Sequence, residues 1–253
     1  MALVDCKFYS EALGMASSLR AILPEVPGTQ RPHRTLWLLH GLSDDEAIWT
    51  RRTSIERYVE PLGIAVVMPN VHRSFYSNMR HGYRYWDFVS EELPAKARAL
   101  FPLSAERADN YVAGLSMGGY GAFKLALSKP HLFAGAAGLS SACDLTYMQR
   151  KWPEDLRLIF DDLAGVRETG GDLFELAARA NASAGPKPRL FQAWGSEDFL
   201  HADNQRFHEL LARLDFDYTC ETGPGDHDWA YWDRTIQSVL SWMNTGTASV
   251  EAF

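Results

Sequence analysis

Residues 110–127 read NYVAGLSMGGYGAFKLAL, and this stretch decides the fold. Its first part, YVAG, is a short apolar run typical of a buried strand, and its last part, GYGAFKLAL, has the length and pattern of a helix. Between them lies the motif G-x-S-x-G, formed by Gly114, Ser116 and Gly118. Small residues two positions either side of the serine let strand and helix approach closely. The stretch therefore predicts a strand, a strained turn that carries Ser116, and a helix.

This arrangement is the one that a nucleophilic serine requires, because the turn lifts the hydroxyl above the edge of the sheet. A glycine-rich turn with a bystander serine is the plainer alternative. A phosphate-binding loop is disfavoured because no lysine follows the glycines.

Apolar runs alternate with longer amphipathic stretches along the chain, which favours an α/β fold with a mainly parallel central sheet and helices on both faces. The runs, each expected to be buried on both faces, are 35–41, 64–70, 110–116, 133–141, 189–196 and 217–225. Two further segments, 7–13 and 17–24, are predicted to open the sheet as antiparallel strands. The helical candidates are 54–62, 83–101, 119–130, 204–215 and 232–244.

The length of 253 residues and a hydrophobic content of 46% suit one large core. Because no repeat or linker divides the chain, we expect residues 1–253 to form a single domain. Residues 145–188 fit the alternation least well. We expect them to be an insertion over the active site.

Composition excludes several classes of protein. The net charge of −7 gives no basic stripe for nucleic acid. Charged residues interrupt the N-terminal segment, so it does not resemble a signal peptide, and no run approaches the roughly 20 apolar residues of a membrane span. Cys6, Cys143 and Cys220 are few and widely spaced, which indicates reduced thiols in a cytoplasm rather than disulfides or a metal site. We expect Cys143 to be a buried thiol rather than a nucleophile.

A serine hydroxyl needs a base, and in this kind of fold the acid and then the histidine follow the serine along the chain. Four histidines lie after Ser116. His131 and His208 fall at or within helices and are expected to face solvent, whereas His227 stands in the glycine-rich loop GPGDHDW. We predict His227 as the base, with His201 as the next candidate.

The acid must accept a hydrogen bond from the imidazole. Asp198 follows the apolar run 189–196 and is the predicted acid, although Glu197, the residue directly before it, is a competitor. Asp203, Asp226 and Asp228 are competitors. The last two flank His227, and neighbouring side chains in an extended loop point apart.

Backbone amides must hold the negative oxygen that forms when a serine attacks a carbonyl. The residue after the nucleophile, Met117, supplies one amide. Leu42, in the loop HGLSDDEAIW, supplies the other, and Gly41 gives that loop its freedom. His40 is expected to support the loop rather than to ionise.

Six segments, in order and with compatible spacing from about Leu36 to Trp242, resemble the tributyrin esterase group of the esterase D family. They are HGLSDDEAIWTRRTSIERY, VVMPN, SFYSNMRHGYRYWDF, AGLSMGGYGAFKLAL, GSEDFL and GPGDHDWAYW. That family also contains S-formylglutathione hydrolases and feruloyl esterase-like enzymes. The resemblance implies an α/β-hydrolase fold, carboxylesterase activity on short acyl esters, no cofactor and a small-molecule ester as partner. Matched by position, it also implies the triad Ser116, Asp198 and His227 and the oxyanion amides of Leu42 and Met117.

Aromatic residues near the predicted loops are expected to narrow the acyl pocket, and Phe75, Tyr76 and Trp229 are the predicted substrate-binding residues. Residues of the 145–188 segment could instead form the wall, namely Met148, Trp152 and Phe160. A thioesterase acting like S-formylglutathione hydrolase, for which the chain is somewhat short, and a catalytically silent binding scaffold stay open as alternatives. So does a homo-oligomer.

Overall fold

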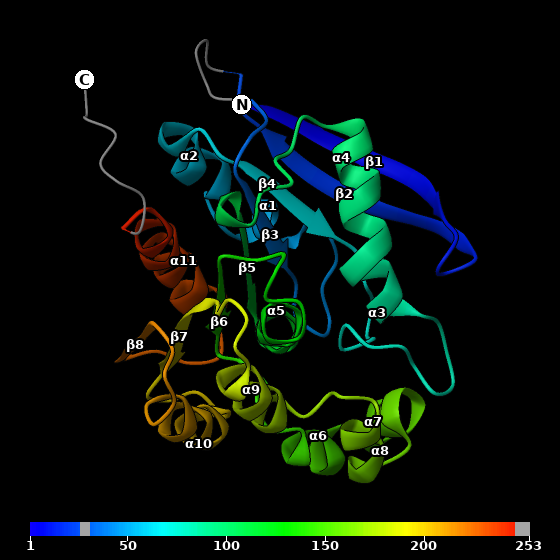
Figure 1. Cartoon of the computed structure of the whole chain (residues 1–253), viewed down its shortest axis with the longest axis vertical. Coiled ribbons are helices and arrows are strands. Elements are labelled where there is room, and N and C mark those ends of the chain that lie inside the picture. The colour runs from blue at the N-terminus through cyan, green and yellow to red at the C-terminus, as the bar shows by residue number, and fades with distance from the viewer. Residues whose placement is uncertain (26–30, 246–253) are drawn as a thin grey trace.

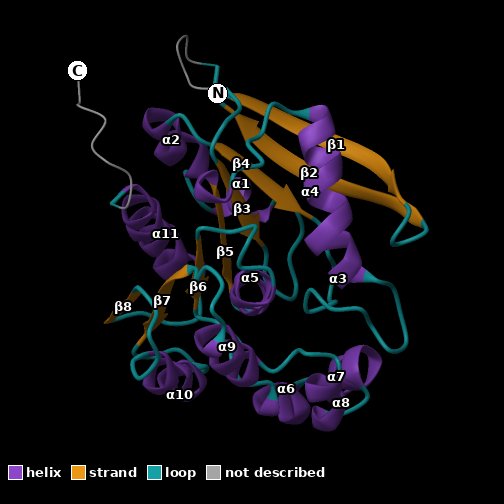
Figure 2. Ribbon diagram, in the orientation of Figure 1, coloured by secondary structure: helices purple, strands orange, loops and turns teal. Residues whose placement is uncertain are grey.

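The structure, a computed structural model, describes residues 1–25 and 31–245. Within these residues one sheet of eight strands runs through the molecule, in the order β1-β2-β4-β3-β5-β6-β7-β8 (Figures 1 and 2). The strands are β1 (Ala2–Ser10), β2 (Met15–Leu23), β3 (Thr35–Leu39), β4 (Ala65–Pro69), β5 (Asn110–Leu115), β6 (Gly135–Leu139), β7 (Arg189–Gly195) and β8 (Tyr218–Gly223).

The pairing matches a mainly parallel sheet with an antiparallel beginning. β1 pairs antiparallel with β2 and β2 with β4, while the pairs from β4 through β3, β5, β6 and β7 to β8 are parallel. The predicted opening hairpin is thus confirmed, with its first strand starting earlier, at Ala2. The expectation for residues 217–225 is wrong in one respect: β8 is an edge strand, so its side chains are partly exposed rather than buried on both faces.

Helices cover both faces of the sheet, and a separate group follows β6. The helical segments are α1 (Ile48–Arg52), α2 (Ile55–Val59), η1 (Glu60–Leu62), α3 (Tyr85–Asp87), η2 (Phe88–Glu92), α4 (Leu93–Leu100), η3 (Arg107–Asp109), α5 (Met117–Ser128), α6 (Thr146–Lys151), α7 (Pro153–Phe160), α8 (Leu163–Glu168), α9 (Leu173–Ala182), α10 (His201–Leu211) and α11 (Trp229–Asn244).

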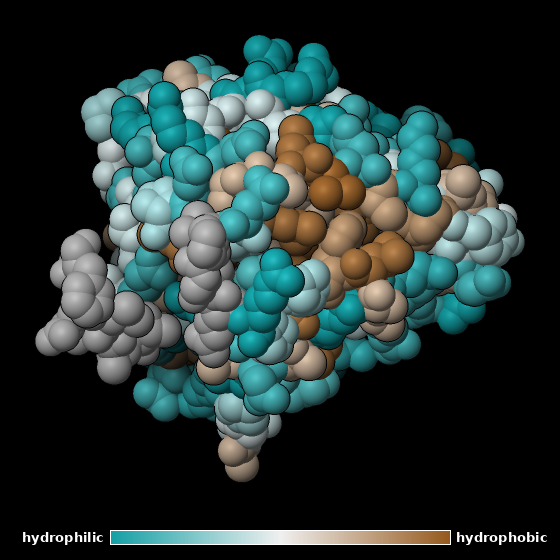
Figure 3. Space-filling model, turned by 90° about the horizontal axis from the view of Figure 1, so that it is seen from above, coloured by the Kyte–Doolittle hydropathy of each residue, from teal (hydrophilic) through white to brown (hydrophobic). Residues whose placement is uncertain are grey.

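The buried side chains of the described residues form a core on each face of the sheet. Along β3, Trp37 and Leu39 belong to one core, which includes side chains of α4, α5, α9 and α10. The alternate residues Leu36 and Leu38 belong to the other core, with side chains of α1, α2 and α11. This alternation follows from the two-residue period of a strand. Outside the cores, hydrophilic side chains surround an apolar area on the face seen from above (Figure 3).

The segment 145–188, which fitted the strand and helix alternation poorly, forms helices α6 to α9 between β6 and β7. Figure 1 shows α6, α7 and α8 together at the lower end of the molecule, away from β1 and β2. Within the described residues, no helix has both the length and the apolar character needed to cross a membrane.

Candidate active site

Ser116 occupies the sharp turn between β5 and α5. Its backbone φ of 54° lies in the left-handed region that side-chain-bearing residues rarely adopt. The turn is possible because the residues two positions before and after Ser116 are glycines. A Cβ atom on Gly114 would lie 2.4 Å from the backbone of Gly118, and one on Gly118 would lie 2.5 Å from the carbonyl oxygen of Leu39. The Ser116 amide donates a hydrogen bond of 2.8 Å to the Leu139 carbonyl. The motif thus produces the predicted strand, turn and helix.

His227 reaches Ser116 from the loop between β8 and α11. Its Nε2 lies 3.0 Å from Ser116 Oγ, although 111 residues separate the two in sequence. The ring is packed between aromatic side chains, with the centroid of Phe199 at 4.3 Å and that of Trp232 at 4.9 Å. These contacts leave the His227 side chain only 12% exposed, so the imidazole is held within reach of the hydroxyl.

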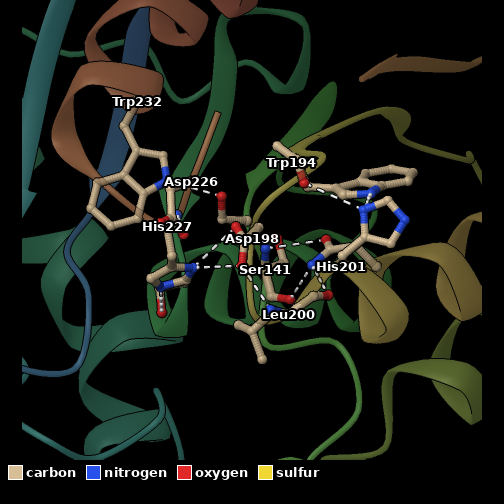
Figure 4. Close-up of polar contacts among 12 residues, drawn as sticks. Ser141, Trp194, Asp198, Leu200, His201, Asp226, His227 and Trp232 are labelled. Carbon is tan, nitrogen blue, oxygen red and sulfur yellow. Dashed lines mark hydrogen bonds and ion pairs between the residues drawn. The ribbon is translucent and has the colours of Figure 1, made fainter. Parts of the chain in front are cut away.

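Asp198 follows β7 and completes a hydrogen-bonded line. Its two carboxylate oxygens lie 3.0 and 3.1 Å from His227 Nδ1, and the Leu200 amide donates to Oδ1 at 2.7 Å. Burial acts to raise the pKa of Asp198. The hydrogen bond and charge of His227, with bonds from Ser140 and Leu200, outweigh burial and lower the pKa below its usual value. Figure 4 shows Asp198 between His227 and Leu200, with Trp232 beside the imidazole.

The competing carboxylates have other partners. Asp228 is the N-cap of α11 and accepts from the Tyr231 amide at 2.9 Å, and Asp226 accepts from the backbone amide of His227. Asp203 is buried and bonds Arg206 within α10. Asp228 is also a signal that could have located the helix start at Trp229, three residues before the predicted one.

The remaining histidines do not reach the serine. His131 is exposed, as expected. His201 Nδ1 lies 3.2 Å from the indole nitrogen of Trp194, and Figure 4 shows this ring turned away from Asp198. His208 is half-buried and contacts the Tyr218 hydroxyl at 2.8 Å, so the expectation that it faces solvent is wrong in part. The helix carrying it packs against β7, and β8 lies beside that strand.

His40 lies behind the loop that carries Leu42. The Val71 amide donates to its Nε2 at 3.0 Å, so the proton is on Nδ1, which donates to the Gly41 carbonyl at 2.7 Å. Burial lowers the pKa of His40 to about 4, so the ring is neutral near pH 7. The bond orients the peptide unit whose N–H belongs to Leu42.

The two amides expected to bind an oxyanion belong to Leu42 and Met117. Leu42 lines the same cleft as Ser116. Met117 is the first residue of α5, where backbone N–H groups have no acceptor within the helix.

Ser116 and His227 open into a cleft of about 510 Å³. The other residues that line it are Gly41, Leu42, Ser43, Asp44, Arg73, Leu115, Trp152, Phe199, Asp228, Trp229 and Trp232. Cleft residues that sequence reasoning did not single out include Arg73 and Phe199. For Phe199, its position directly after Asp198 is the signal that could have found it.

Trp229 is the predicted substrate-binding residue that the structure places in the cleft. The expectation for Phe75 and Tyr76 is wrong, because both rings are buried in the core beneath it, only 2% and 0% exposed. The Tyr76 hydroxyl donates to the His40 carbonyl at 2.9 Å, and the ring packs where Gly121 has no side chain. These aromatics therefore support the site from behind.

The insertion contributes one wall of the cleft. Trp152 lines it, whereas Met148 and Phe160 are buried in the core. Tyr147 stacks on Phe199 with ring centroids 5.3 Å apart. At the rim, Arg73 bonds both carboxylate oxygens of Asp155, a residue of α7, at 2.9 and 2.6 Å. The insertion is thus fastened to the body of the protein beside the serine.

Two further chemistries find little support in the described residues. Cys143 is buried, and that burial raises the pKa of its thiol well above the usual value, so it is a weak candidate nucleophile. No group of three or more His, Cys, Asp or Glu side chains in the described chain is arranged to hold a metal ion. The arrangement that remains is a hydroxyl, an imidazole and a buried carboxylate in line. It can remove the hydroxyl proton and stabilise the resulting imidazolium.

Known proteins share this architecture along nearly the whole chain. The fold and the serine turn define an α/β-hydrolase. The Esterase family model matches residues 10–243, and the chain belongs to this family. Within it the chain is an esterase D-like carboxylic ester hydrolase. An acetyl esterase of Caldicellulosiruptor saccharolyticus is 28% identical over 96% of this chain and 98% of its own.

Two solved structures from Staphylococcus aureus are 40% identical to this chain. The fluorophosphonate-binding serine hydrolase FphF superposes with a TM-score of 0.89, and the S-formylglutathione hydrolase FrmB with a TM-score of 0.87. Each comparison covers 96% of this chain and 98% of the other. Length therefore does not separate this chain from that S-formylglutathione hydrolase, contrary to the sequence-based expectation. The chain is a carboxylic ester hydrolase.

Proposed function

We propose that this enzyme is a serine carboxylesterase that hydrolyses short-chain acyl esters through an acyl-enzyme intermediate. The observation that carries the proposal is the line from Ser116 Oγ to His227 to Asp198, with hydrogen-bond distances of 3.0 to 3.1 Å. Asp198 can only accept a hydrogen bond as a carboxylate, so His227 Nδ1 carries the proton and Nε2 is the acceptor.

In the first half of the proposed reaction, His227 Nε2 takes the proton of Ser116 as Oγ attacks the ester carbonyl carbon. The carbonyl oxygen becomes an oxyanion, for which the amides of Leu42 and Met117 are the proposed donors. The tetrahedral intermediate collapses when the imidazolium protonates the leaving alcohol. The acyl group is then bound to Ser116.

In the second half, His227 removes a proton from water, which attacks the acyl carbon. A second tetrahedral intermediate forms at the same amides, and the imidazolium returns the proton to Ser116 as the acid leaves. Asp198 keeps the imidazole in one orientation through both halves and stabilises its positive charge.

The preference for short acyl groups is supported by the aromatic side chains that line the cleft, Trp152, Trp229 and Trp232, and by the similarity to an acetyl esterase. We expect kcat/KM to be highest for acetyl to butyryl groups across p-nitrophenyl acetate, butyrate, octanoate and palmitate. In a longer apolar groove, each acyl methylene that became buried would instead add about 0.8 kcal/mol of binding free energy. A rate that climbs past octanoate would contradict the short-chain proposal.

A thioesterase acting on S-formylglutathione is the second candidate, favoured by the 40% identity to an S-formylglutathione hydrolase. The same three side chains would perform the reaction. Turnover of S-formylglutathione compared with that of p-nitrophenyl acetate separates the two. A fluorophosphonate probe that fails to label the folded protein would instead support a silent scaffold.

We also propose a reducing, cytoplasmic setting, since Cys6, Cys143 and Cys220 are all unpaired. Fractionation of the producing cells should recover the enzyme with cytoplasmic proteins, and recovery from a secreted fraction would contradict this setting.

A further inference from the structure

The loops that carry the predicted acid and base lie against each other two to three residues before those side chains. Gly195 ends β7, and a Cβ atom added to it would lie 2.0 Å from the carbonyl oxygen of Gly225. Gly225 has a φ of 153°, and a Cβ atom there would lie 2.4 Å from the ring of Tyr231. The two backbones can approach this closely because Gly195 has no Cβ atom, and Gly225 fits beside Tyr231 for the same reason.

One residue, Glu197, bonds both polar backbone groups of Gly225. The Glu197 amide donates to the Gly225 carbonyl at 3.0 Å, and the Gly225 amide donates to Glu197 Oε2 at 2.7 Å. The Ser196 hydroxyl donates to the other carboxylate oxygen at 2.7 Å. The bond from Gly225 is the foremost cause that lowers the pKa of Glu197, so the side chain accepts as a carboxylate near pH 7.

The position of Glu197 in the chain gives this contact its significance. Asp198 is the next residue, and Gly225 precedes His227 by two residues. The Ser196 amide adds a bond of 2.9 Å to the Gly223 carbonyl at the end of β8. The His227 loop is therefore tied to the Asp198 loop through Glu197 and its neighbour, at the point where β7 and β8 separate.

We propose that Glu197 is a positioning residue: its carboxylate holds the Gly225 amide and thereby sets the distance between His227 and Asp198. The inference rests on the proposed function, because it concerns the same catalytic line. Glu197 touches neither substrate nor the reacting atoms. It acts by limiting the conformations of the loop that carries the base, and misplacing such a group by about 1 Å can cost up to roughly 100-fold in rate.

Three substitutions separate the hydrogen bond from the charge. Glu197→Gln removes the charge but keeps an oxygen that can accept from Gly225. Glu197→Asp keeps the charge but shortens the side chain by one methylene, which withdraws the acceptor. Glu197→Ala removes both. Glu209→Ala is the matched control, because Glu209 is also an exposed glutamate but lies on α10, where Gln205 of the same helix donates to it.

We expect Glu197→Asp and Glu197→Ala to lower kcat for p-nitrophenyl acetate by about 10-fold, with KM changed less, because the base is misplaced while the cleft is intact. Glu197→Gln should restore most of the lost kcat, and Glu209→Ala should match the unsubstituted enzyme. Wild-type kcat in Glu197→Ala, or equal losses in the Gln and Asp variants, would overturn the inference.

A second measurement does not require turnover. The proton shared by His227 and Asp198 should give a downfield NMR resonance, identified by its loss in His227→Ala. It should broaden or disappear in Glu197→Asp and persist in Glu197→Gln. If the enzyme hydrolyses no ester at all, the proposed function fails, whereas an unchanged resonance in Glu197→Asp refutes the positioning role separately.

Discussion

Two carboxylates near the cleft are held in different ways: Asp198 lies behind His227 at the floor that Ser116 and His227 form, and Asp155 lies at the rim beside Arg73. Asp198 has a fully buried side chain that bonds His227 Nδ1 and the Leu200 amide. Asp155 belongs to the insertion and bonds Arg73, whose side chain is 48% exposed. Exposed ion pairs are screened by water and contribute little to stability. Removing one partner of a buried pair is strongly destabilising, because the other partner is left buried and uncompensated. The floor is therefore expected to determine the chemistry, and the rim the shape of the cleft.

The largest effect expected from the floor is that of Ser116→Ala, which removes the attacking oxygen. Hydrolysis of p-nitrophenyl acetate should fall by roughly 10⁴- to 10⁶-fold, since no acyl-enzyme can form. Circular dichroism should show a folded protein, because only one hydroxyl is lost. Near wild-type turnover would end the serine esterase proposal, and fluorophosphonate labelling of the variant would point to another nucleophile.

Asp198→Asn tests the one-residue choice between two neighbouring acids. We expect kcat to fall by about 10³- to 10⁴-fold, because an amide can neither stabilise the imidazolium nor fix the required tautomer. Glu197→Gln and Asp203→Asn serve as controls, and their losses should be much smaller. Comparable losses in Glu197→Gln and Asp198→Asn would contradict the assignment of Asp198.

At the rim, Trp152→Ala should change selectivity rather than chemistry. Without this ring the wall recedes, and each acyl methylene that gains contact contributes about 0.8 kcal/mol, a factor of about four. We expect the ratio of kcat/KM for octanoate to that for acetate to rise at least about 10-fold. Tyr83→Ala, at an exposed ring that does not line the cleft, is the control and should leave the ratio unchanged.

The buried carboxylate also makes stability depend on pH. Burial raises the pKa of Asp198, but the bonds to His227, Ser140 and Leu200 lower it below the ordinary value. The unfolded chain then binds more protons than the folded one as the pH falls through this range. This contribution is complete above the unfolded pKa of about 3.9 and is lost as the pH falls through the folded pKa.

Urea unfolding at several pH values from about 5 to about 3 should therefore show a steeper loss of unfolding free energy for the unsubstituted enzyme than for Asp198→Asn. Parallel curves for the two proteins would mean that Asp198 has the same pKa in the folded and unfolded chains.

The smallest effect is expected from Asp155→Asn. Removing this partly exposed ion pair should lower the unfolding free energy by about 1 kcal/mol or less. Activity on p-nitrophenyl acetate should stay within about twofold, because the pair does not touch the catalytic line. A loss comparable to that of Asp198→Asn would show that the insertion is needed for the chemistry and would remove the distinction between floor and rim.

Much of the fold and of the candidate site could be predicted from local patterns. Gly114, Ser116 and Gly118 mark the turn within five residues, because strand and helix can approach closely only at residues without a Cβ atom. The order of serine, acid and histidine locates the other two side chains, because parallel strands bring their carboxyl ends to one edge of the sheet. Both steps use only residue types and their order along the chain, together with the general geometry of parallel sheets.

Other assignments could not be made from sequence, because they depend on which way a side chain points after packing. Asp198 is buried and Glu197 exposed, although they are neighbours in the same loop. Phe75 and Tyr76 were expected at the cleft as aromatic residues near the predicted catalytic loops, yet both rings are buried in the core. Hydrophobicity alone does not distinguish an aromatic side chain that lines a cleft from one that supports it.

The sequence by itself therefore determined the strand, turn and helix around Ser116 and the order of the loops that follow it, since steric fit and chain order act locally. Only the tertiary structure decided that Trp152 and Phe199 form the cleft wall, that Glu197 bonds Gly225, and that Arg73 fastens the insertion. The Glu197 and Arg73 bonds join residues that are 28 and 82 positions apart in the sequence. The cleft wall depends on how helices and loops are placed relative to each other, which follows from packing the whole chain.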